Sequence, residues 1–481
     1  MDLPPPLAWR PVAAVSGALV ALLLLVSGGY GHHRDELYFR ALSEHPAWGY
    51  VDQPPLTPLL AGLSRAVFGD TLPGLRVLPA LAAGLLVVLV ALVARELGGR
   101  GTAQALAAFG TAGGVYTLIA GHTMLTVSFD LPCWLAAILF TVRALRGRPR
   151  WWLAVGVVAG LATYNKLLIV LLFAGLAAGL LAVGPRRVLA SPWLWAGALV
   201  AAVLAAPNLV YQVTNGWPQL AMAEALRADE GDEMRVLFAP MQLLLFGPVV
   251  AVIGAFGWWR LWRDRRVRAA AVAYPVAAVV TLVTGGRFDY TGGLILLLFA
   301  AGCVGVEAAG AGRPRSAAVS LTLNAAGGAL LALPLVPVTV LGSTPIPAIN
   351  EVARESVGWP RFTAAVRGVL DTLPPEERAR AIVLTGSYGE HGELVRAGVP
   401  RVYSGHNQLH AYGPPPETGT VAVTVNIGRR GMDFQYAACE ERATIDNGVG
   451  VENELQGMTV HLCRGLKQPW SAAWPRYRHL S

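Results

Sequence analysis

The stretch that decides the fold is residues 30–76, YGHHRDELYFRALSEHPAWGYVDQPPLTPLLAGLSRAVFGDTLPGLR. It lies between two long apolar runs, yet it carries Asp35, Glu36, Glu44 and Asp52, two adjacent histidines and several arginines. Acidic groups at a membrane boundary are costly, so they are candidates for function. A solvated loop with incidental charges is the alternative, and it would be favoured for one carboxylate alone. The rest of the chain bears on this choice.

The composition indicates a polytopic membrane protein. Of 481 residues, 54% are hydrophobic and 14% are charged, and the mean hydropathy is +0.49. A soluble globular protein has about a quarter of its residues charged. The net charge is +8, but the arginines form short clusters between apolar runs, which is typical of membrane topology rather than of a nucleic-acid-binding surface. We therefore expect membrane lipid and no nucleic acid as a partner.

The apolar runs predict about eleven transmembrane helices. Arg10 and the run after it resemble a signal peptide, but no convincing cleavage site follows, so an uncleaved first span is expected. The runs on either side of Tyr164-Asn165-Lys166 are short for a perpendicular crossing. The predicted spans are 12–28, 77–94, 102–120, 131–145, 151–164, 166–183, 192–208, 241–259, 269–284, 291–307 and 318–340.

The charges in the loops predict the orientation. With the N-terminus in the cytoplasm, basic clusters such as Arg143–Arg150 and Arg260–Arg268 fall on the inner side. Most acidic residues, including the run 224–233, which we interpret as a solvated face, then fall outside. We expect a multi-pass protein of the plasma membrane with its chemistry on the outer face.

After Leu341 the composition changes, and residues 346–481 contain no apolar run of membrane length. We predict a transmembrane domain over 1–345, with a catalytic first outer loop at 29–76, and an extracytoplasmic α/β domain over 346–481. The domain's expected helices are 361–373 and 388–397, and its expected strands are 381–385, 401–403 and 420–425. Outside the cell, Cys439 and Cys463 can form a disulfide; two unpaired thiols are the alternative.

Two acidic positions are candidates for catalysis. Asp35 and Glu36 lie just beyond the first span, where a partly desolvated carboxylate can act as a general base toward a hydroxyl group. Asp130, in HTMLTVSFDLPCW, lies near a helix N-terminus beside Pro132. By itself Asp130 is better explained as a helix cap. Two carboxylates from different outer loops are harder to explain by capping.

Two basic positions are candidates for phosphate binding. Of the 38 Lys and Arg residues, only Lys166 and Lys467 are lysines. A lysine kept at position 166 can serve as a compact phosphate ligand, with a snorkelling interfacial lysine as the equal alternative. Arg287, in GGRFDY, can clamp a phosphate, or it can simply balance Asp289 at the membrane surface.

The proline-rich segment WGYVDQPPLTPLL predicts short helices that lie along the membrane plane, because its prolines break a longer helix. Trp48 and Tyr50 suit a membrane interface. No Cys/His spacing indicates a metal site, and loop polarity explains His391, His406 and His410 equally well.

Several motifs resemble the bacterial family 39 glycosyltransferases, which are related to protein O-mannosyltransferases and lipid A aminoarabinose transferases. The resemblance covers nearly the whole chain, and its first two motifs together are specific. The motifs are DELYF (35–39), GYVDQPPLTPLL (49–60), GLRVLPAL (74–81), TVSFD ending at Asp130, LATYNK (161–166), NGWP (215–218), YGEHGEL (388–394) and YSGHNQ (403–408).

The resemblance implies a C-type glycosyltransferase fold that transfers a sugar, such as mannose, from a polyprenyl-phosphate donor to an acceptor protein or glycan, with inversion at the anomeric carbon. By matching position, Asp35 is the expected base and Asp130 the second acidic residue, while Lys166 and Arg287 are expected to bind the donor phosphate. Many members of the family carry Lys where Arg287 stands. Glu36 is a further catalytic candidate, and the other site candidates are Tyr50, Asp52, Gln53 and His122.

No metal or other cofactor is obligatory for such a donor, and a divalent metal is not indicated by the sequence. The alternative function is a transporter or flippase of a lipid-linked sugar. Such a protein would more naturally place ionisable groups in mid-span and contain internal repeats, and neither pattern is found.

Overall fold

The computed structural model describes residues 4–310 and 312–481. It divides into two compact units, which we describe separately. The helical unit contains Met1–Ser27, Gln53–Thr57 and Pro73–Leu333, and the α/β unit contains Gly28–Asp52, Pro58–Leu72 and Pro334–Ser481. This division differs from the predicted boundary at residue 345, because most of the first outer loop packs with the C-terminal part of the chain.

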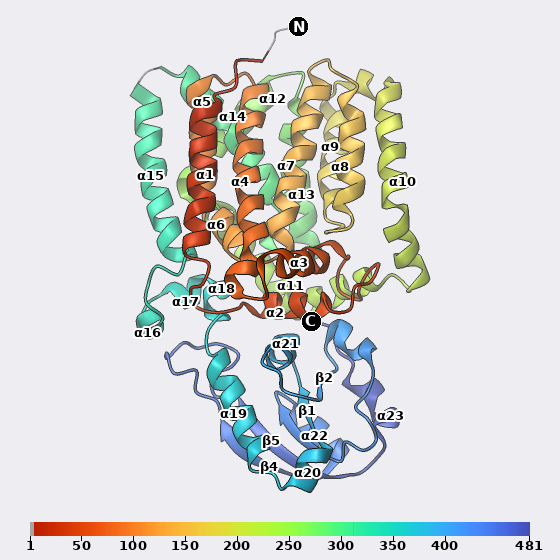
Figure 1. Cartoon of the computed structure of the whole chain (residues 1–481). Helices are drawn as coiled ribbons and strands as arrows, with labels where there is room; N and C mark the ends of the chain where they lie inside the picture. The colour runs from red at the N-terminus through yellow and green to blue at the C-terminus, as the bar shows by residue number, and fades with distance from the viewer. Residues whose placement is uncertain (1–3, 311) are drawn as a thin grey trace. The chain divides into compact units, whose positions relative to one another are not determined.

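Each predicted apolar run is helical over most of its length, although 102–120 and 241–259 each contain a break between two helices. Figure 1 shows the helices of the helical unit packed together. They are α1 (Trp9–Leu25), α4 (Leu72–Glu96), α5 (Gly101–Ala112), α6 (Val115–His122), α7 (Thr126–Leu145), α8 (Trp151–Ala162), α9 (Ile169–Val183), α10 (Pro192–Thr214), α11 (Pro218–Leu244), α12 (Pro248–Arg263), α13 (Arg268–Thr284), α14 (Gly292–Ala308) and α15 (Gly312–Ala332). Two 3-10 turns, η1 (Arg186–Ala190) and η2 (Phe288–Thr291), precede α10 and α14.

Among the described residues, four helices are long and apolar enough to cross a membrane, or up to six if each bent pair is one span. The bent pairs are α5 with α6, at 60°, and α11 with α12, at 87°. Others are shorter, such as α8 with 12 residues. The predicted run 102–120 is therefore broken at Gly113-Gly114, and the acidic run 224–233 belongs to α11 rather than to a loop.

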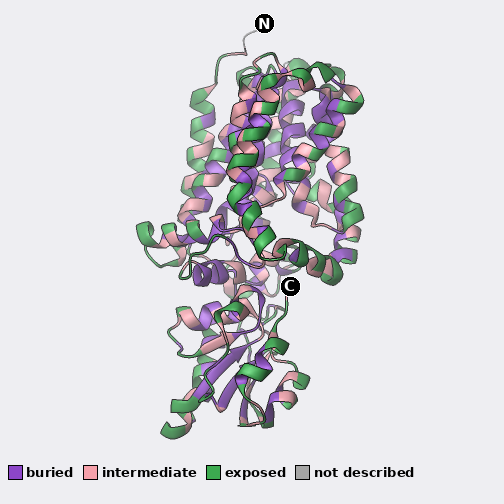
Figure 2. Cartoon of the chain, turned by 90° about the vertical axis from the view of Figure 1, so that its right-hand side faces the viewer, coloured by how far each residue is buried: buried purple, intermediate pink, exposed green. Residues whose placement is uncertain are grey.

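The helical unit has a buried interior and an apolar exterior. Figure 2 shows buried residues on the inward faces of the helices and exposed residues on the outward faces. On α10 the exposed residues Leu199, Val203 and Val210 form an apolar stripe, as expected of a surface in lipid. Inside, α12 and α14 pack closely: a Cβ at Gly257 would lie 1.8 Å from the Leu298 carbonyl oxygen. Small residues at such crossings allow backbones to approach.

The α/β unit contains a five-stranded sheet of order β2-β1-β3-β5-β4. β1 (Ala381–Thr385) pairs in parallel with β2 (Val402–Ser404) and β3 (Val421–Val425), whereas β5 (Thr459–Leu466) is antiparallel to β3 and β4 (Tyr436–Thr444). The helices of this unit include α2 (Arg34–Leu42), α19 (Trp359–Asp371), α20 (Pro375–Arg380), α21 (Tyr388–Arg396), α22 (Arg429–Gln435) and α23 (Trp470–Ala473). Short helices α16 (Val338–Leu341), α17 (Ile346–Ile349) and α18 (Glu351–Arg354) precede α19.

The core of the α/β unit lies between the sheet and α19, where Phe362, Val366, Val383 and Val423 are fully buried. The predicted α/β domain is confirmed, and β4 and β5 are strands that the sequence did not predict. A disulfide joins Cys439 on β4 to Cys463 on β5.

Candidate active site

Asp35 lies in the first turn of α2, whose N-terminus is fixed by a capping box. The backbone N–H of Asp35 donates to His33 Nδ1 at 3.3 Å, and the backbone N–H of His33 donates to Glu36 Oε2 at 2.9 Å. Glu36 is fully buried. These bonds satisfy amides that the helix itself leaves unpaired. Glu36 therefore stabilises the start of the helix.

The Asp35 carboxylate is held by a tyrosine from a distant part of the sequence. The Tyr388 hydroxyl donates to Asp35 Oδ1 at 2.8 Å, while Asp35 Oδ2 lies 3.9 Å from His33 Nδ1. The Asp35 side chain remains 32% exposed. Burial, followed by the charge on Asp35, raises the pKa of Tyr388 well above its usual value. Tyr388 is therefore a stable hydrogen-bond donor to the carboxylate at neutral pH.

A second acidic residue belongs to the same network. The rings of Tyr38 and Tyr388 stack with centroids 4.6 Å apart, and the Tyr38 hydroxyl donates to Asp52 Oδ1 at 3.0 Å. That hydroxyl accepts a hydrogen bond from the backbone N–H of Gln408 at 3.2 Å. Burial raises the pKa of Asp52 to about 7, against the opposing effect of the Tyr38 hydrogen bond. Asp35 and Asp52 are therefore linked through the stacked rings of Tyr388 and Tyr38, each carboxylate bonded to one of the two hydroxyl groups.

The two helices that carry this network pack closely because α21 presents glycines to α2. A Cβ at Gly389 would lie 2.9 Å from Arg34 Cβ, and a Cβ at Gly392 would lie 2.6 Å from the Leu37 carbonyl oxygen. The glycines of the YGEHGEL motif thus let Tyr388 reach Asp35.

Charged pairs hold the other end of α2. Arg40 donates twice to Asp70, at 3.0 and 2.7 Å, and Arg65 donates to Asp70 at 3.0 and 2.9 Å and to Glu44 at 3.1 Å. Burial opposes ionisation, but the hydrogen bonds from the two arginines lower the pKa of Asp70 to about 2. This network joins α2 to the segment that follows α3 (Leu56–Phe68).

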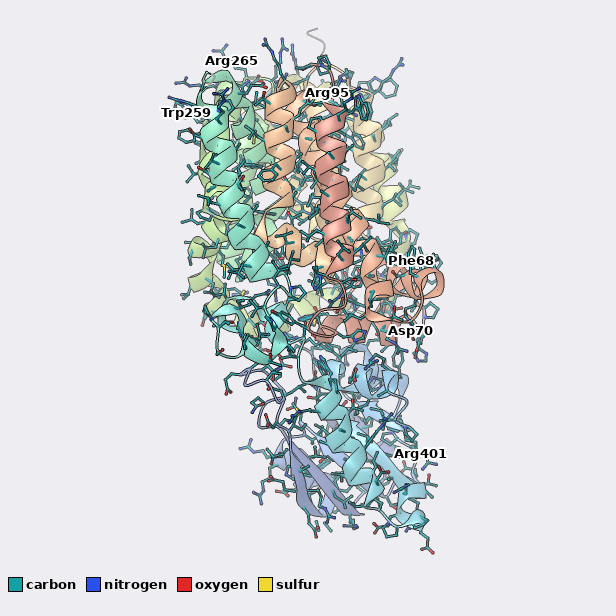
Figure 3. The ribbon with its side chains drawn as sticks, turned by 60° about the vertical axis from the view of Figure 1, so that its left-hand side comes forward. Phe68, Asp70, Arg95, Trp259, Arg265 and Arg401 are labelled. Carbon is teal, nitrogen blue, oxygen red and sulfur yellow. A yellow bond between two sulfur atoms is a disulfide. The ribbon has the colours of Figure 1, made fainter. Side chains whose placement is uncertain are left out.

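Helix α3 has an exposed apolar face, formed by Leu59, Leu63, Val67 and Phe68, and Figure 3 shows Phe68 and Asp70 near its end. This face suits a helix along the membrane plane. The expectation that Tyr50 lies at the interface is wrong. Tyr50 is fully buried, and its hydroxyl lies 3.2 Å from the His45 carbonyl oxygen, whereas Trp48 is exposed.

Asp130 lies inside the helical unit and does not cap its helix. Helix α7 begins at Thr126, and the N-terminal bond is made by Ser128 Oγ, which accepts from the backbone N–H of Leu125 at 3.2 Å. Asp130 is buried, and its Oδ1 has no hydrogen-bond partner among the described residues. A buried carboxylate oxygen without a partner is costly, so this position calls for a functional explanation.

Lys166 lies in the turn between α8 and α9, close enough to Asp130 for their charges to interact. Its Nζ lies 4.8 Å from the centre of the Tyr290 ring, and its charge interacts with those of Asp289 and Asp130. The preceding Asn165 fixes the turn by accepting from Thr57 Oγ1 at 2.8 Å and donating to the Thr126 carbonyl at 2.9 Å. Lys166 is therefore positioned among carboxylates.

Arg287 and Asp289 interact as one of the two alternatives predicts. Arg287 Nε lies 3.5 Å from Asp289 Oδ1, and its Nη1 lies 3.8 Å from Glu230 Oε2. Asp289 is buried and accepts a hydrogen bond from the Tyr116 hydroxyl. The Arg287 side chain remains 40% exposed. Part of the Arg287 side chain is therefore accessible from outside the protein.

The remaining candidates in the helical unit are His122 and Gln53, and both are buried. Arg76 Nη1 lies 3.0 Å from His122 Nε2 and donates to the Ser27 carbonyl at 2.9 Å. Because an arginine only donates, His122 Nε2 accepts and its ring proton lies on Nδ1. Gln53 is buried, and its Nε2 has no hydrogen-bond partner among the described residues.

The predicted site residues thus form two groups. Asp35, Glu36 and Asp52 lie together in the α/β unit, and Asp130, Lys166 and Arg287 lie together in the helical unit. The sequence reasoning missed Tyr38, Tyr388, Tyr116 and Tyr290. Tyr38 and Tyr388 lie in the motifs DELYF and YGEHGEL, which are the signal that identifies them. Among residues 4–310 and 312–481, no group of three His, Cys, Asp or Glu residues could hold a metal ion.

Comparisons with known proteins agree with this architecture. Residues 52–211 match the family model described as dolichyl-phosphate-mannose-protein mannosyltransferase. The crystal structure of ArnT from Cupriavidus metallidurans bound to undecaprenyl phosphate is similar, with a TM-score of 0.60 and 15% identity over 93% of this chain and 97% of that chain. Its apo structure has a TM-score of 0.52 and 14% identity over the same shares of the two chains.

The cryo-EM structure of the arabinofuranosyltransferase AftD from Mycobacteria has a TM-score of 0.55 and 13% identity, over 96% of this chain and 40% of that chain. Among curated protein sequences, none matches this chain. The fold is that of the C-type glycosyltransferases, and the resemblance predicted from the sequence is confirmed in the fold and in the matched segment.

Proposed function

We propose that this chain is an inverting glycosyltransferase that moves a sugar from a polyprenyl-phosphate donor to a hydroxyl group of a protein, glycolipid or cell-wall glycan. The observation that carries the proposal is the match of residues 52–211 to the mannosyltransferase family model, within a chain whose fold resembles ArnT. The ArnT structure was solved with undecaprenyl phosphate bound, which supports a lipid phosphate as the carrier of the sugar.

In the proposed reaction the acceptor oxygen attacks the anomeric carbon of the donor sugar, and the bond between that carbon and the phosphate oxygen breaks. Asp35 takes the proton from the attacking hydroxyl group, because it is a partly exposed carboxylate held in one orientation by Tyr388. The polyprenyl phosphate leaves with the electrons of the broken bond. Attack from the face opposite the phosphate inverts the anomeric carbon.

Lys166 and Arg287 are the proposed ligands of the donor phosphate. Negative charge grows on the phosphate as it leaves, and fixed cations stabilise that charge. Asp130 and Asp289 act on Lys166 through their charges, so they keep its ammonium group in place before the donor binds. We propose Asp130 as the second acidic residue of the site, because the Lys166 charge offsets part of the cost of burying it.

No metal is required in this proposal, because protein cations take the place that a divalent ion holds with nucleotide-sugar donors. Sidedness is also part of the proposal: the N-terminus lies in the cytoplasm and the α/β unit lies outside. The name of the matched family favours mannose as the first donor to test. The transporter alternative receives no support from the comparisons, since the matched family is described as a mannosyltransferase and the AftD structure as an arabinofuranosyltransferase.

The test uses purified protein in lipid with radiolabelled polyprenyl-phosphate mannose, other hexoses and pentoses, and membrane extract as the acceptor. We expect one donor class to pass its label to an acceptor, and we expect the same transfer in the presence of EDTA. Movement of an intact donor across the bilayer without transfer from any donor would contradict the proposal. Loss of transfer in EDTA, restored by a divalent ion, would overturn its metal-independent part.

A further inference from the structure

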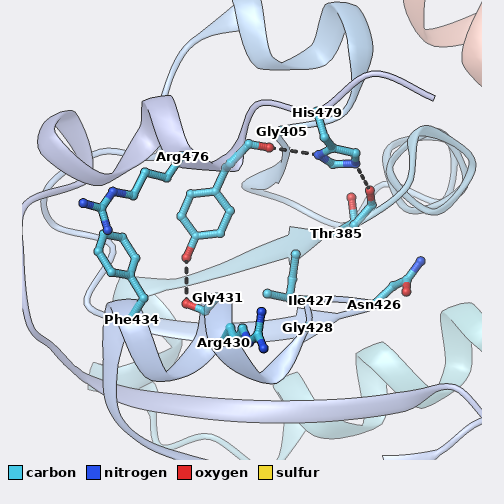
Figure 4. A pocket seen from close by; sticks show the side chains of 12 residues that line it. Thr385, Gly405, Asn426, Ile427, Gly428, Arg430, Gly431, Phe434, Arg476 and His479 are labelled. Atoms are coloured by element: carbon cyan, nitrogen blue, oxygen red, sulfur yellow. Dashed lines mark hydrogen bonds between the residues drawn. The ribbon is translucent and has the colours of Figure 1, made fainter. Parts of the chain in front are cut away.

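The α/β unit contains a cavity that the proposed reaction does not use. It has a volume of about 500 Å³ and lies at the carboxyl ends of the parallel strands. Thr385 and Gly386 contribute the end of β1, Gly405 follows β2, and Asn426 follows β3. We call it the strand-end crevice, and Figure 4 shows its lining.

The topology of the sheet places a binding crevice at this point. From β1 the chain passes through α21 to β2 on one side, and it then returns to β3 on the other side of β1. The connections after β1 and β3 therefore leave the sheet in opposite directions. In open α/β sheets, ligands bind in the crevice that such a reversal creates at the carboxyl ends of the strands.

The charges around the crevice are of one sign. Arg430, from α22, and Arg476, from the segment after α23, both line it, together with His479 (Figure 4). None of its lining residues that the structure describes is Asp or Glu. The acidic residue behind the wall is Glu390, which accepts from Asn426 Nδ2 at 2.9 Å, and burial raises its pKa to about 8. The crevice therefore attracts anions.

The two arginines are available to a ligand. The Arg476 guanidinium lies 4.3 Å from the centre of the Phe434 ring, and neither Arg430 nor Arg476 forms an ion pair within the described ranges. His479 is held in place, with its ring nitrogens 2.9 Å from the carbonyl oxygens of Tyr477 and Gly386. A guanidinium donates two parallel hydrogen bonds to a phosphate or a carboxylate, so two of them can hold one such group firmly.

The neutral part of the wall suits a sugar ring. Phe434 and Tyr477 line the crevice beside the arginines. Aromatic faces support the C–H faces of sugar rings, and a few fixed polar groups then set the orientation of the ligand.

We propose that the strand-end crevice is a binding site for an anionic saccharide, meaning a sugar that carries a phosphate or a carboxylate, held by Arg430 and Arg476. In the proposed transferase this ligand is part of the acceptor glycan, and that assignment rests on the proposed function. The binding site itself does not rest on it.

The structure offers variants that separate binding from folding. A Cβ at Gly428 meets no atom within 4 Å, and the residue has an ordinary φ of −58°, so Gly428→Leu fills the crevice without strain. Arg430→Gln and Arg476→Gln remove the cations. Arg429→Gln is the matched control, because Arg429 is an exposed neighbour that does not line the crevice.

The experiment titrates the full chain, in nanodiscs of uncharged lipid, with glucose 1-phosphate, glucuronate, inorganic phosphate and glucose by calorimetry. We expect saturable binding of at least one anionic sugar and none of glucose. Each arginine substitution should weaken that binding on the order of tenfold, and Gly428→Leu should abolish it. Arg429→Gln should bind as the wild type does. Binding of glucose 1-phosphate would show that the site takes a phosphate, and binding of glucuronate would show that it takes a carboxylate.

Two results would overturn the proposal. If neither anionic sugar binds, the crevice is not a binding site for them. If inorganic phosphate binds as tightly as glucose 1-phosphate, the site recognises the anion alone and not the saccharide. The same titration is made with Asp35→Asn, where binding should persist although transfer is lost. Failure of the transfer reaction and failure of this site are thereby distinguished.

Discussion

At the scale of the residue, the proposed base depends on the hydrogen bond that Tyr388 donates to Asp35. The two residues are far apart in sequence, but Asp35 belongs to α2 and Tyr388 to α21, and these two helices pack against each other. Tyr388 stays protonated because burial raises its pKa. Its hydroxyl therefore stabilises the charged form of the carboxylate and fixes one of its two oxygens.

We predict that Tyr388→Phe lowers the transfer rate by about ten- to a hundredfold. The acidic limb of the pH profile should also move to higher pH, because the carboxylate loses a hydrogen bond that favours its charged form. Transfer rates measured from about pH 5 to about pH 9 check this shift. Tyr436→Phe is the control, since its buried hydroxyl has no hydrogen-bond partner among the described residues. A lower rate with an unmoved profile would mean that Tyr388 is only structural.

A second prediction concerns Asp52 and the stability of the fold. Its folded pKa is raised to about 7, chiefly by burial, whereas an unfolded aspartate titrates near pH 4. Between these values the unfolded chain loses a proton that the folded chain keeps, so stability falls as the pH rises through this window. Asp52→Asn removes that fall.

The Tm of Asp52→Asn relative to the wild type should therefore increase from about pH 5 to about pH 8. Thermal unfolding in lipid at several pH values measures the difference. Parallel curves for the two proteins would show that Asp52 ionises normally in the folded chain.

At the scale of the element, α2 is held at both ends: by the capping box at His33 and by the Arg40–Asp70–Arg65 network. The network matters more than a single surface ion pair because two arginines share one carboxylate and Arg40 is buried. It keeps α2 in position for Asp35.

We predict that Asp70→Asn lowers the Tm by about 2–4 °C, which corresponds to about 1 kcal/mol. Asp371→Asn is the control, because Asp371 forms one exposed ion pair, 3.5 Å from Arg378. Thermal unfolding of both variants gives the comparison. Equal shifts in the two variants would contradict a special role for the network around Asp70.

Helices and strands could be predicted from the sequence where a continuous run of apolar residues marks them. The apolar runs identified the helices, and β1 and β3 were predicted because every residue in them is buried and apolar or Thr. β4 was missed because its charged residues Glu440, Glu441 and Arg442 face solvent in an edge strand. The bend at Gly113-Gly114 was missed because it depends on close packing: a Cβ at Gly113 would lie 2.3 Å from Ala325 Cβ.

The candidate site was predicted in part for the same reason. Asp35, Asp130 and Lys166 are charged residues beside apolar runs, which single-sequence reasoning detects. Tyr388 and Tyr116 were not predicted as partners, because only the folded chain brings Tyr388 to Asp35 and Tyr116 to Asp289. The alternative explanation of Asp130 as a helix cap is wrong because α7 begins earlier, at Thr126.

At the scale of the whole molecule, the disulfide bears on the proposed sidedness. Cys439 and Cys463 are joined on neighbouring strands, whereas Cys133 and Cys303 are free. Disulfides persist in oxidising compartments and are rare in the cytosol. A disulfide in the α/β unit therefore supports an extracytoplasmic location for that unit.

We predict that alkylation of the denatured protein from native membranes labels Cys133 and Cys303 without reductant, and all four cysteines after reduction. Mass spectrometry of the peptides reads the result. Labelling of Cys439 and Cys463 without reductant would contradict the extracytoplasmic location.

The central claim is that Asp35 is the base of a lipid-phosphate-dependent glycosyl transfer. The most direct measurement compares wild type, Asp35→Asn and the control Asp371→Asn in lipid, with a radiolabelled polyprenyl-phosphate sugar and its acceptor. We predict that Asp35→Asn loses transfer by about a hundredfold or more while its Tm and its donor binding stay unchanged, and that Asp371→Asn transfers normally. Turnover at the wild-type rate in Asp35→Asn would remove Asp35 from the mechanism.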